Sequence, residues 1–272
     1  AIPYGLGAGG VDAILNNYVA LHYKAQHMSW LHCMWGVGAS ISPYIMSFAL
    51  VKFDHWSYGC LIIAIMQIVL STVIFTSIPL WKKGMTADNE ATQTKSLSFK
   101  EIFTAKGAIP CFIAFFAYCA LELTTSLWAS SYLVQKWALT PEAAAGFASL
   151  FYIGVTFGRF ANGFLAIKFS DRFLIRMGLA IIAAGIALLF VPFHAAFALI
   201  GFVIIGLGCA PIDPCLIHMT PAIFGEEKSQ AMIGVQTAFS YIGYLTTPTL
   251  FGLIVDYISI SLLPVFILGL LL

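Results

Sequence analysis

Charged residues are scarce in this sequence. Lys, Arg, Asp and Glu make up 9% of the 272 residues, whereas 60% are hydrophobic and the mean hydropathy is +0.92. A soluble domain carries about 25% charged residues, so this chain has too few charges to cover a water-facing surface. The net charge is only +1, without the basic field that nucleic-acid binding requires. The composition therefore indicates a membrane protein and excludes a nucleic-acid partner.

The sequence also lacks the short motifs of enzymes and metal sites. It has no H-E-x-x-H, G-x-S-x-G or Walker loop. The glycines of residues 5–10 form G-x-G-x-G-G inside an apolar segment, where phosphate binding is implausible. We therefore expect a protein that is not an enzyme and that uses no cofactor and no metal. The cysteines form no C-x-x-C pair, which indicates buried, free thiols rather than a disulfide framework: Cys33, Cys60, Cys111, Cys119, Cys209 and Cys215.

Apolar blocks of about twenty residues, separated by short polar breaks, make up most of the chain. Blocks of this length cross a hydrocarbon core of about 30 Å as helices. The last block is short, and neither an initiator Met nor a signal peptide opens the sequence, so we expect a piece of a longer protein. The predicted segments are nine in number: 1–22, 28–50, 56–81, 107–135, 144–167, 173–193, 195–222, 229–257 and 259–272.

The basic residues predict how these segments are oriented. If the breaks alternate between two sides of the membrane, one side holds only Lys52 and Lys136. By the positive-inside rule the other side is cytoplasmic. The cytoplasmic side holds ten basic residues: Lys24, Lys82, Lys83, Lys95, Lys100, Lys106, Lys168, Arg172, Arg176 and Lys228.

Residues 82–106 form the one long polar break, which lies on the predicted cytoplasmic side. Three segments precede it and six follow it. A long cytoplasmic linker in the middle of a hydrophobic chain typically separates two helical bundles, although an ordinary loop is the alternative.

Four ionisable residues lie inside the apolar segments: Asp12, Glu122, Arg159 and Asp213. A charge at the centre of a membrane helix costs about 2.5–3.5 kcal/mol on insertion scales, so each needs a structural or functional reason. Asp256 lies near a segment end, where the interface solvates it. We therefore expect these four residues to be structural anchors or to line a water-accessible path.

The neighbours of these residues extend the pattern. Asp12 shares a helix face with Asn16. Glu122 heads a polar and aromatic stripe typical of a wet cavity, with helix packing as the alternative; the stripe contains Tyr118, Thr125, Ser126 and Trp128.

Asp213 lies between Pro211 and Pro214, which interrupt backbone hydrogen bonding, and His218 follows one turn later. Asp213 could cap freed amides or line a cavity. Two further polar groups have helical spacing: His32 with Trp35, and Gln236 with Ser240, Tyr244 and Thr247.

Residues 9–18, GGVDAILNNY, combine a glycine run, a carboxylate, an asparagine four residues later and an aromatic residue. This pattern resembles the fourth helix of the major facilitator superfamily, within it the fucose-permease-like sugar:proton symporters, with Asp12 where the permease has Glu. Residues 30–39, WLHCMWGVGA, resemble the fifth helix, with His32 where the permease has a substrate-contacting Gln.

The second half of the chain continues the resemblance. Tyr118, Glu122, Trp128 and Tyr132 match the Y-x-G-x-E…W…Y-L pattern of the seventh helix, with Ala120 in place of the glycine. Residues 158–176 are similar to the helix 8–9 loop motif but lack its glycine between Arg172 and Arg176. Residues 206–214, GLGCAPIDP, resemble the tenth helix, with Asp213 where an aromatic residue is usual.

The resemblance implies an all-α, multi-pass protein of the inner (plasma) membrane with two six-helix bundles, of which about nine helices are present. Residues 1–81 would form the rear half of the N-terminal bundle (helices 4–6), 82–106 the central cytoplasmic loop, and 107–272 the C-terminal bundle (helices 7–12). It further implies a monomer whose partners are a small-molecule solute, the proton and the lipid bilayer.

We predict proton-coupled transport of a small polar solute, a sugar or related polyol, by alternating access. Asp12 would accept the proton. Substrate would be bound by Asn16, His32, Trp35, Tyr118, Glu122, Trp128 and Gln236. A charge latch at the cytoplasmic end would consist of Arg159, Asp171, Arg172 and Arg176. The alternatives are a drug or metabolite exporter on the same fold and a non-transporting membrane receptor or scaffold.

Overall fold

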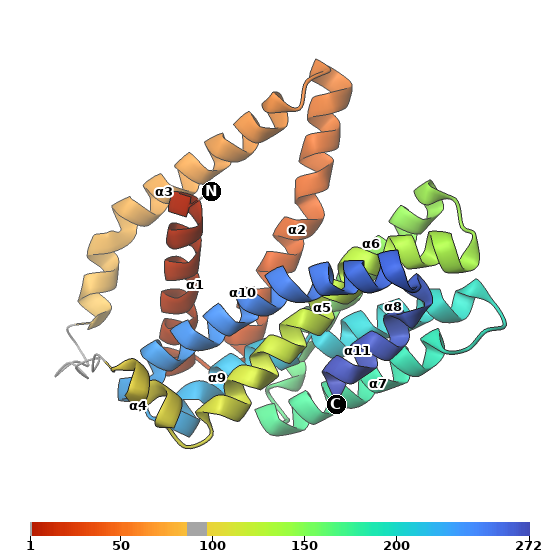
Figure 1. The fold of residues 1–272 in the computed structure, drawn as a ribbon. Coiled ribbons are helices and arrows are strands. Elements are labelled where there is room, and N and C mark those ends of the chain that lie inside the picture. Colours follow the sequence, from red (N-terminus) through yellow and green to blue (C-terminus); the bar gives the residue numbers. More distant parts are fainter. Residues whose placement is uncertain (1, 86–96) are drawn as a thin grey trace. The chain divides into compact units, whose positions relative to one another are not determined.

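The computed structural model describes residues 2–85 and 97–272, and within these ranges every regular element is a helix (Figure 1). Each of the predicted segments overlaps at least one helix. The elements are α1 (Ile2–His22), α2 (Ala25–Phe53), α3 (Ser57–Met85), α4 (Phe99–Thr104), α5 (Ala108–Trp137), α6 (Pro141–Leu165), α7 (Asp171–Leu189), α8 (Ala195–Cys209), α9 (Ile212–Phe224), α10 (Glu226–Tyr257), η1 (Ile260–Leu262) and α11 (Leu263–Leu271).

Among the described residues, five stretches are long and apolar enough to cross a membrane by length and composition. The prediction of an all-helical, multi-pass membrane protein is therefore confirmed, whereas the count of nine crossings stays a prediction. The five stretches are Ser57–Pro79, Ala108–Trp137, Asp171–Leu189, Ala195–Phe224 and Glu226–Tyr257.

Local chemistry explains where several helices begin. Ser98 and Glu101 form a capping box, in which each side chain bonds to the other residue's backbone amide. This pair starts the short helix α4 inside the segment 82–106, which we predicted as a polar linker; residues 86–96 of that segment lie outside the described residues. Thr140 and Ser170 cap α6 and α7 in the same way, each accepting a bond from an amide three residues later.

The predicted interruption near Pro211 is confirmed. Helix α8 ends at Cys209 and α9 begins at Ile212, because Pro211 has no amide hydrogen to continue the helical ladder. Pro214 is the third residue of α9 and removes no hydrogen bond from this helix, since amides in the first turn have no partner within the helix. The break therefore places Asp213 in the first turn of a new helix.

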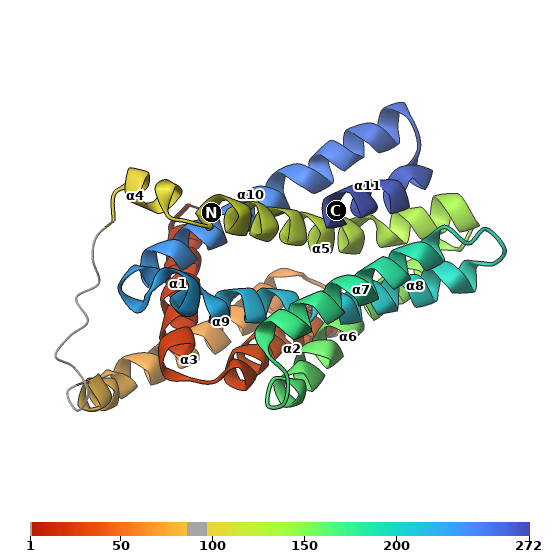
Figure 2. The same ribbon diagram turned by 90° about the horizontal axis from the view of Figure 1, so that it is seen from below.

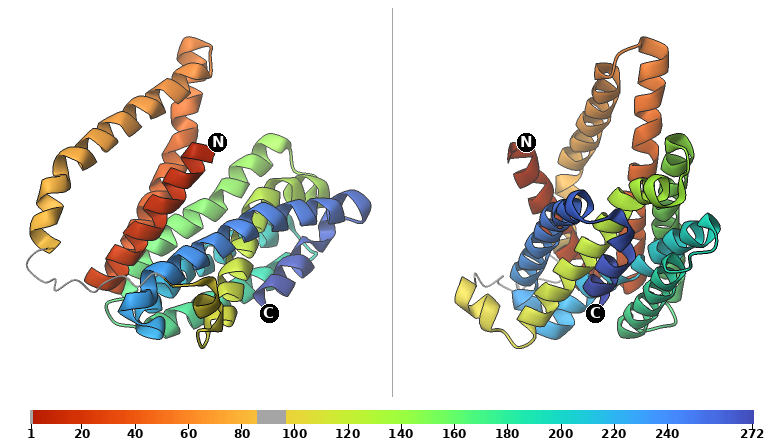
Figure 3. Two further views of the ribbon diagram at one scale, coloured as in Figure 1. Left: turned by 60° about the vertical axis from the view of Figure 1, so that its left-hand side comes forward. Right: turned by 45° about the vertical axis from the view of Figure 1, so that its right-hand side comes forward.

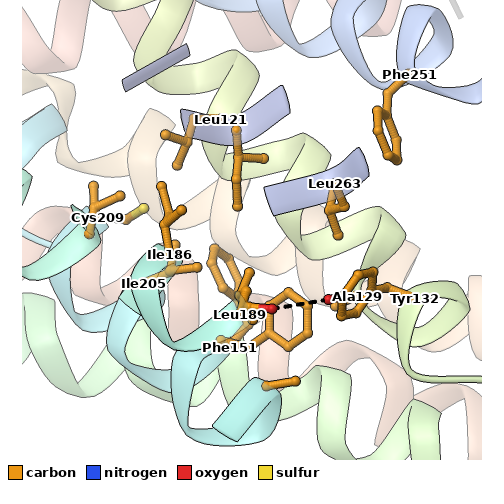
Figure 4. Close-up of a cluster of buried hydrophobic side chains, with 14 of the residues drawn as sticks. Leu121, Ala129, Tyr132, Phe151, Ile186, Leu189, Ile205, Cys209, Phe251 and Leu263 are labelled. Carbon is orange, nitrogen blue, oxygen red and sulfur yellow. Dashed lines mark hydrogen bonds between the residues drawn. The ribbon is translucent and has the colours of Figure 1, made fainter. Parts of the chain in front are cut away.

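The core of the second half of the chain lies among α5, α6, α7, α8 and α11 (Figure 4). Its largest side chains include Tyr132, Phe151 and Phe202, which are almost completely buried. The Tyr132 hydroxyl donates to the Leu189 carbonyl at 3.3 Å, so its one polar atom is satisfied. Helices α7 and α8 run side by side, as do α5 and α10 (Figures 1 and 2).

Glycines allow these helices to approach each other closely. A Cβ at Gly206 of α8 would collide with the Phe151 carbonyl of α6, and one at Gly178 of α7 would lie 2.6 Å from the Gly208 carbonyl of α8. Lipid tails are as apolar as leucine, so helices in a bilayer associate through close packing of this kind.

Helix α1 packs against α9 and α10 (Figure 3). A small buried cluster forms this contact, in which Val19 of α1 and Met28 of α2 meet three side chains from the second half of the chain: Phe115, Ile217 and Ile233. The first helix and the start of the second are thereby held against the helices that follow the linker.

The contacts divide the described residues into two units. One contains the residues up to Gly36 together with those from 97 onward, and the other contains the remainder of α2 and all of α3. In the second unit the chain turns at Asp54, whose φ is 54°, and Phe53 stacks on Tyr58. This grouping does not test the predicted division into bundles at residues 82–106, which stays a prediction.

The cysteines are free thiols, and Cys33, Cys119, Cys209 and Cys215 are buried as predicted. The prediction is wrong for Cys60, which is exposed, and Cys111 is only partly covered. Cys60 lies on α3, where most of the described side chains are exposed.

We expect Gly206→Ala to destabilise the protein, because the added methyl group meets the backbone of α6. Overpacking of this kind costs about 1–3 kcal/mol. Gly234 of α10 is the matched control, since a Cβ there meets nothing within 4 Å and Gly234→Ala gains about 1 kcal/mol of helix propensity. Thermal unfolding in detergent should show a lower Tm for Gly206→Ala alone. An equal or higher Tm for Gly206→Ala would contradict the close packing of α6 on α8.

Candidate functional site

A cavity of about 440 Å³ lies in the unit that contains α1, the start of α2, α5, α6, α9 and α10. Its volume falls within the range of about 300–1,000 Å³ that is usual for small-molecule sites. All six of these helices contribute side chains with polar groups to the lining, beside apolar ones. The polar side chains of the lining are Asp12, Asn16, His32, Trp35, Cys119, Arg159, Asp213, Thr237, Ser240, Tyr241 and Tyr244.

Asp12 and Asn16 lie on the same face of α1, as predicted, and both line the cavity. The Asn16 amide donates to Asp12 Oδ1 at 2.9 Å, and Tyr241 of α10 is a second hydrogen-bond partner of Asp12. The Asn16 carbonyl oxygen is buried and has no hydrogen-bond partner within the described residues. Asn16 thus holds Asp12 through its amide, while its carbonyl oxygen is covered by the protein.

His32 of α2 and Asp213 of α9 meet at the cavity wall. Nε2 of His32 lies 3.1 Å from Asp213 Oδ2, with exposed side-chain fractions of 11% and 18%. Asp213 thus bonds to another helix instead of capping freed amides, which was one of the two roles that the sequence left open. His32 joins the cavity as predicted, but with a carboxylate as its partner.

Arg159 of α6 forms a buried ion pair with Glu122 of α5. Arg159 Nη2 lies 3.4 Å from Glu122 Oε1, and each side chain is only 4% exposed. The Tyr244 hydroxyl donates to Glu122 Oε2 at 3.5 Å. Glu122, predicted to bind substrate, is instead engaged with protein groups and does not line the cavity, because a buried carboxylate requires a partner of opposite charge.

Arg159 also joins parts of the chain that are distant in sequence. Its Nη1 donates to the His32 carbonyl at 3.4 Å, and its guanidinium lies 5.2 Å from the centre of the Trp35 ring. Such cation–π contacts stabilise a desolvated arginine by about 1–2 kcal/mol. Trp35 lines the cavity, as predicted, with this arginine against its ring.

Three other predicted substrate ligands lie away from the cavity lining. Tyr118 donates to the Cys209 carbonyl at 3.1 Å, and Trp128 Nε1 donates to the Pro248 carbonyl at 3.1 Å. Gln236 accepts a hydrogen bond from Thr220 at 3.0 Å and donates to a cysteine sulfur. Tyr118 and Trp128 each join two helices, and Gln236 joins three.

The residues of the predicted charge latch are divided between two places. Arg159 lies in the cavity wall and not in a cluster with Asp171. Asp171, at the start of α7, bonds to His218 of α9 at 2.8 Å, while Arg172 and Arg176 are exposed. The latch role of these residues stays a prediction, and in this structure it would have to involve His218.

The sequence missed two of the polar side chains that α10 contributes to the cavity. We predicted a stripe through Gln236, Ser240, Tyr244 and Thr247, but the lining contains Ser240 and Tyr244 together with Thr237 and Tyr241. The true face has the spacing 237, 240, 241, 244, which is an equally regular helical pattern. The side of α10 that faces the cavity is centred near Tyr241. Gln236 and Thr247 lie outside it and are buried.

Hydrogen bonds join the two sides of the cavity near the turn between α1 and α2. Ser229 donates to Asn17 at 2.6 Å, and Asn162 donates to Ser29 at 2.8 Å. All four side chains are buried. This turn contains Lys24, so this end of the cavity faces the predicted cytoplasmic side.

Trp30 completes the contacts at this end. Its indole fills the space that a side chain at Gly163 would occupy, and it meets the Phe164 ring edge-on at 5.6 Å. At the other end of α1, a Cβ at Gly5, Gly7 or Gly9 would meet nothing within 4 Å. These glycines of α1 therefore make no close interhelical contact of the kind that Trp30 makes with Gly163.

We expect Arg159→Met to destabilise the protein, because it leaves Glu122 buried without a positive partner. Removal of one partner of a buried ion pair costs about 3–5 kcal/mol. The double variant Arg159→Met with Glu122→Gln should recover most of the Tm measured in detergent, because both charges are then removed. Arg172→Met is the control, since Arg172 is exposed. Equal Tm values for Arg159→Met and wild type would show that the pair is not buried.

Comparison with known proteins identifies the family. The sequence profile of the Major Facilitator Superfamily matches residues 110–272. The chain is also similar to Bypass of stop codon protein 6 of Saccharomyces cerevisiae, with 24% identity over 295 residues that cover 97% of this chain and 59% of the yeast protein. The chain thus spans less than two thirds of that relative. Because the profile covers more than half of its residues, this chain belongs to the Major Facilitator Superfamily.

Proposed function

We propose that the protein carries a small polar solute, a sugar or related polyol, across the inner (plasma) membrane in symport with protons, by alternating access. The observation that carries this proposal is the cavity that contains Asp12, His32 and Asp213. Its walls come from helices on both sides of the linker, where a carrier of this family would hold its solute. The fucose-permease-like resemblance supports a sugar as the solute, and the name of the yeast relative does not specify one.

The polar groups of the cavity support a hydroxylated solute. The Thr237 hydroxyl can both donate and accept, and the Ser240 hydroxyl, which donates to the Gln236 carbonyl, can accept. Trp35 and Tyr241 add aromatic surface to the lining, which can contact the carbon atoms of a sugar ring. A mixed lining of this kind suits a ligand with both hydroxyl groups and apolar ring faces.

The carboxylate of Asp12 supports proton coupling. It remains in the cavity with neutral hydrogen-bond partners, Asn16 and Tyr241, whereas Glu122 is neutralised by Arg159. A solvent-reachable carboxylate without a fixed positive partner can take up and release a proton as access changes.

The contacts near the α1–α2 turn support alternating access. They close the cavity at the predicted cytoplasmic end through Ser229–Asn17, Asn162–Ser29 and the packing of Trp30 on Gly163. Release of solute to the cytoplasm would require these contacts to separate. Each consists of neutral groups, so water can replace the hydrogen bonds at small cost.

We expect the complete protein in proteoliposomes to accumulate at least one member of a panel of radiolabelled monosaccharides and polyols when a pH gradient is imposed. With one proton per solute, a gradient of about one pH unit supports an accumulation of about tenfold. Asp12→Asn should abolish accumulation and leave solute exchange measurable, because the proton site is lost while the cavity remains.

Asp256→Asn is the matched control, since Asp256 is exposed near the end of α10. Undiminished accumulation by Asp12→Asn would refute the coupling role. Extrusion of toxic organic cations without uptake of any sugar or polyol would identify an exporter, and no flux of any solute would favour a receptor or scaffold.

A further inference from the structure

We propose that His32 and Asp213 form a proton-binding site that joins α2 to α9, so that a bound proton holds these two helices together. The role of this site in transport rests on the proposed function, whereas its existence rests on the geometry of the pair. The two helices come from opposite sides of the linker, α2 before it and α9 after it.

The hydrogen bonds of the His32 ring require a proton on each nitrogen. Nδ1 lies 2.9 Å from the Met28 carbonyl oxygen, and a carbonyl can only accept. Nε2 lies 3.1 Å from Asp213 Oδ2, which also only accepts when the carboxyl group is ionised. A neutral histidine has one N–H group, so the two contacts together need one additional proton.

That proton resides on the ring. We place it there because an imidazolium can donate from both nitrogens, Nδ1 to the Met28 carbonyl and Nε2 to Asp213. The pair is therefore an imidazolium and a carboxylate with zero net charge. When the proton leaves Nε2 for water in the cavity, a neutral ring and a carboxylate remain, and the charge of the pair becomes −1.

The proton on the pair determines the net charge of the groups around the cavity. Arg159 and Glu122 neutralise each other, and Asp12 interacts electrostatically with both His32 and Asp213. Arg159 also interacts electrostatically with Asp213, but its positive charge is balanced by Glu122. Loss of the proton therefore leaves two neighbouring carboxylates, Asp12 and Asp213, with an uncompensated negative charge at the cavity, which is costly. The titratable and charged groups around His32 are Asp12 of α1, Glu122 of α5, Arg159 of α6, Asp213 of α9, and Tyr241 and Tyr244 of α10.

Loss of the proton also removes the ion pair between the helices, and loss from Nε2 removes the hydrogen bond as well. The Nε2 lone pair then faces the Asp213 carboxylate, so an attractive contact becomes a repulsive one. Both side chains are partly exposed at the cavity, so water can reach the proton without prior opening of the helices. The site thus connects proton release with separation of α2 from α9.

The role of this pair differs from that of Asp12. Asp12 bonds to Asn16 on its own helix and to a neutral tyrosine, contacts that remain possible in either protonation state. The contact between His32 and Asp213 is an ion pair only with the proton bound. His32 and Asp213 therefore form a second proton site. Unlike protonation of Asp12, protonation of this pair changes a contact between two helices.

The test uses the complete protein, labelled with ¹⁵N-histidine and reconstituted in lipid nanodiscs at pH 7. Nuclear magnetic resonance distinguishes an imidazolium from a neutral ring by the ¹⁵N shifts, and His32→Gln assigns the His32 signals. We expect an imidazolium at His32 in wild type and a neutral ring in Asp213→Asn. Asp213→Glu should restore the imidazolium, because it restores the negative charge.

Two controls separate this effect from misfolding. Asp256→Asn should leave the His32 signals unchanged. The signals of His218, which bonds to Asp171 and not to Asp213, should be the same in wild type and Asp213→Asn. A neutral His32 in wild type would overturn the proposal, and so would an imidazolium that persists in Asp213→Asn with the His218 signals intact.

Transport supplies the second measurement. In proteoliposomes with a gradient of about one pH unit, Asp213→Asn should lose the roughly tenfold accumulation of the sugar or polyol taken up by wild type. Full accumulation by Asp213→Asn would overturn the role in coupling. If wild type moves no solute of the panel, the proposed function fails, but the resonance experiment still decides whether the proton site exists.

Discussion

The cost of charge in an apolar medium shapes the interior of this chain. An ionised side chain in such a medium needs a partner of opposite charge or access to water, and the described residues supply both. Arg159 and Glu122 form a closed pair that is almost inaccessible. Asp12, His32 and Asp213 remain at the cavity, where water can solvate them. The charges of the interior are thus of two kinds: the Arg159–Glu122 pair holds helices together, whereas the charges at the cavity can exchange protons or bind a ligand.

Helix packing makes this arrangement possible. Glycines bring α6 and α7 against α8 at distances that exclude any side chain, so these helices act as a firm support for the residues they carry. The break at Pro211 then starts α9 in a position from which Asp213 reaches His32. A continuous helix would keep the ladder of backbone bonds but would not place this carboxylate at the start of a new helix.

Sequence patterns predicted the fold better than the site because they report different physical quantities. Long apolar blocks reflect the thickness of a bilayer and therefore predicted where α5 or α7 would lie. The rotation of a helix about its own axis depends on its neighbours, and α10 illustrates this: the polar stripe was recognised, but Gln236 points to other helices while Tyr241 lines the cavity. Likewise, Glu122 was correctly recognised as a costly charge, but its neutralisation by Arg159 depends on two helices that meet only in the folded chain.

The sequence by itself determined the membrane class, the approximate helix boundaries, the break at Pro211 and the small set of charges that need a reason to be buried. These follow from composition, length and backbone chemistry, which act locally along the chain. Only the tertiary structure decided which charges pair. His32 and Asp213 are separated by most of the chain, and Arg159 meets Glu122 from another helix. Pairing energies fall off within a few ångströms, so they depend on distances that are set when the helices pack together.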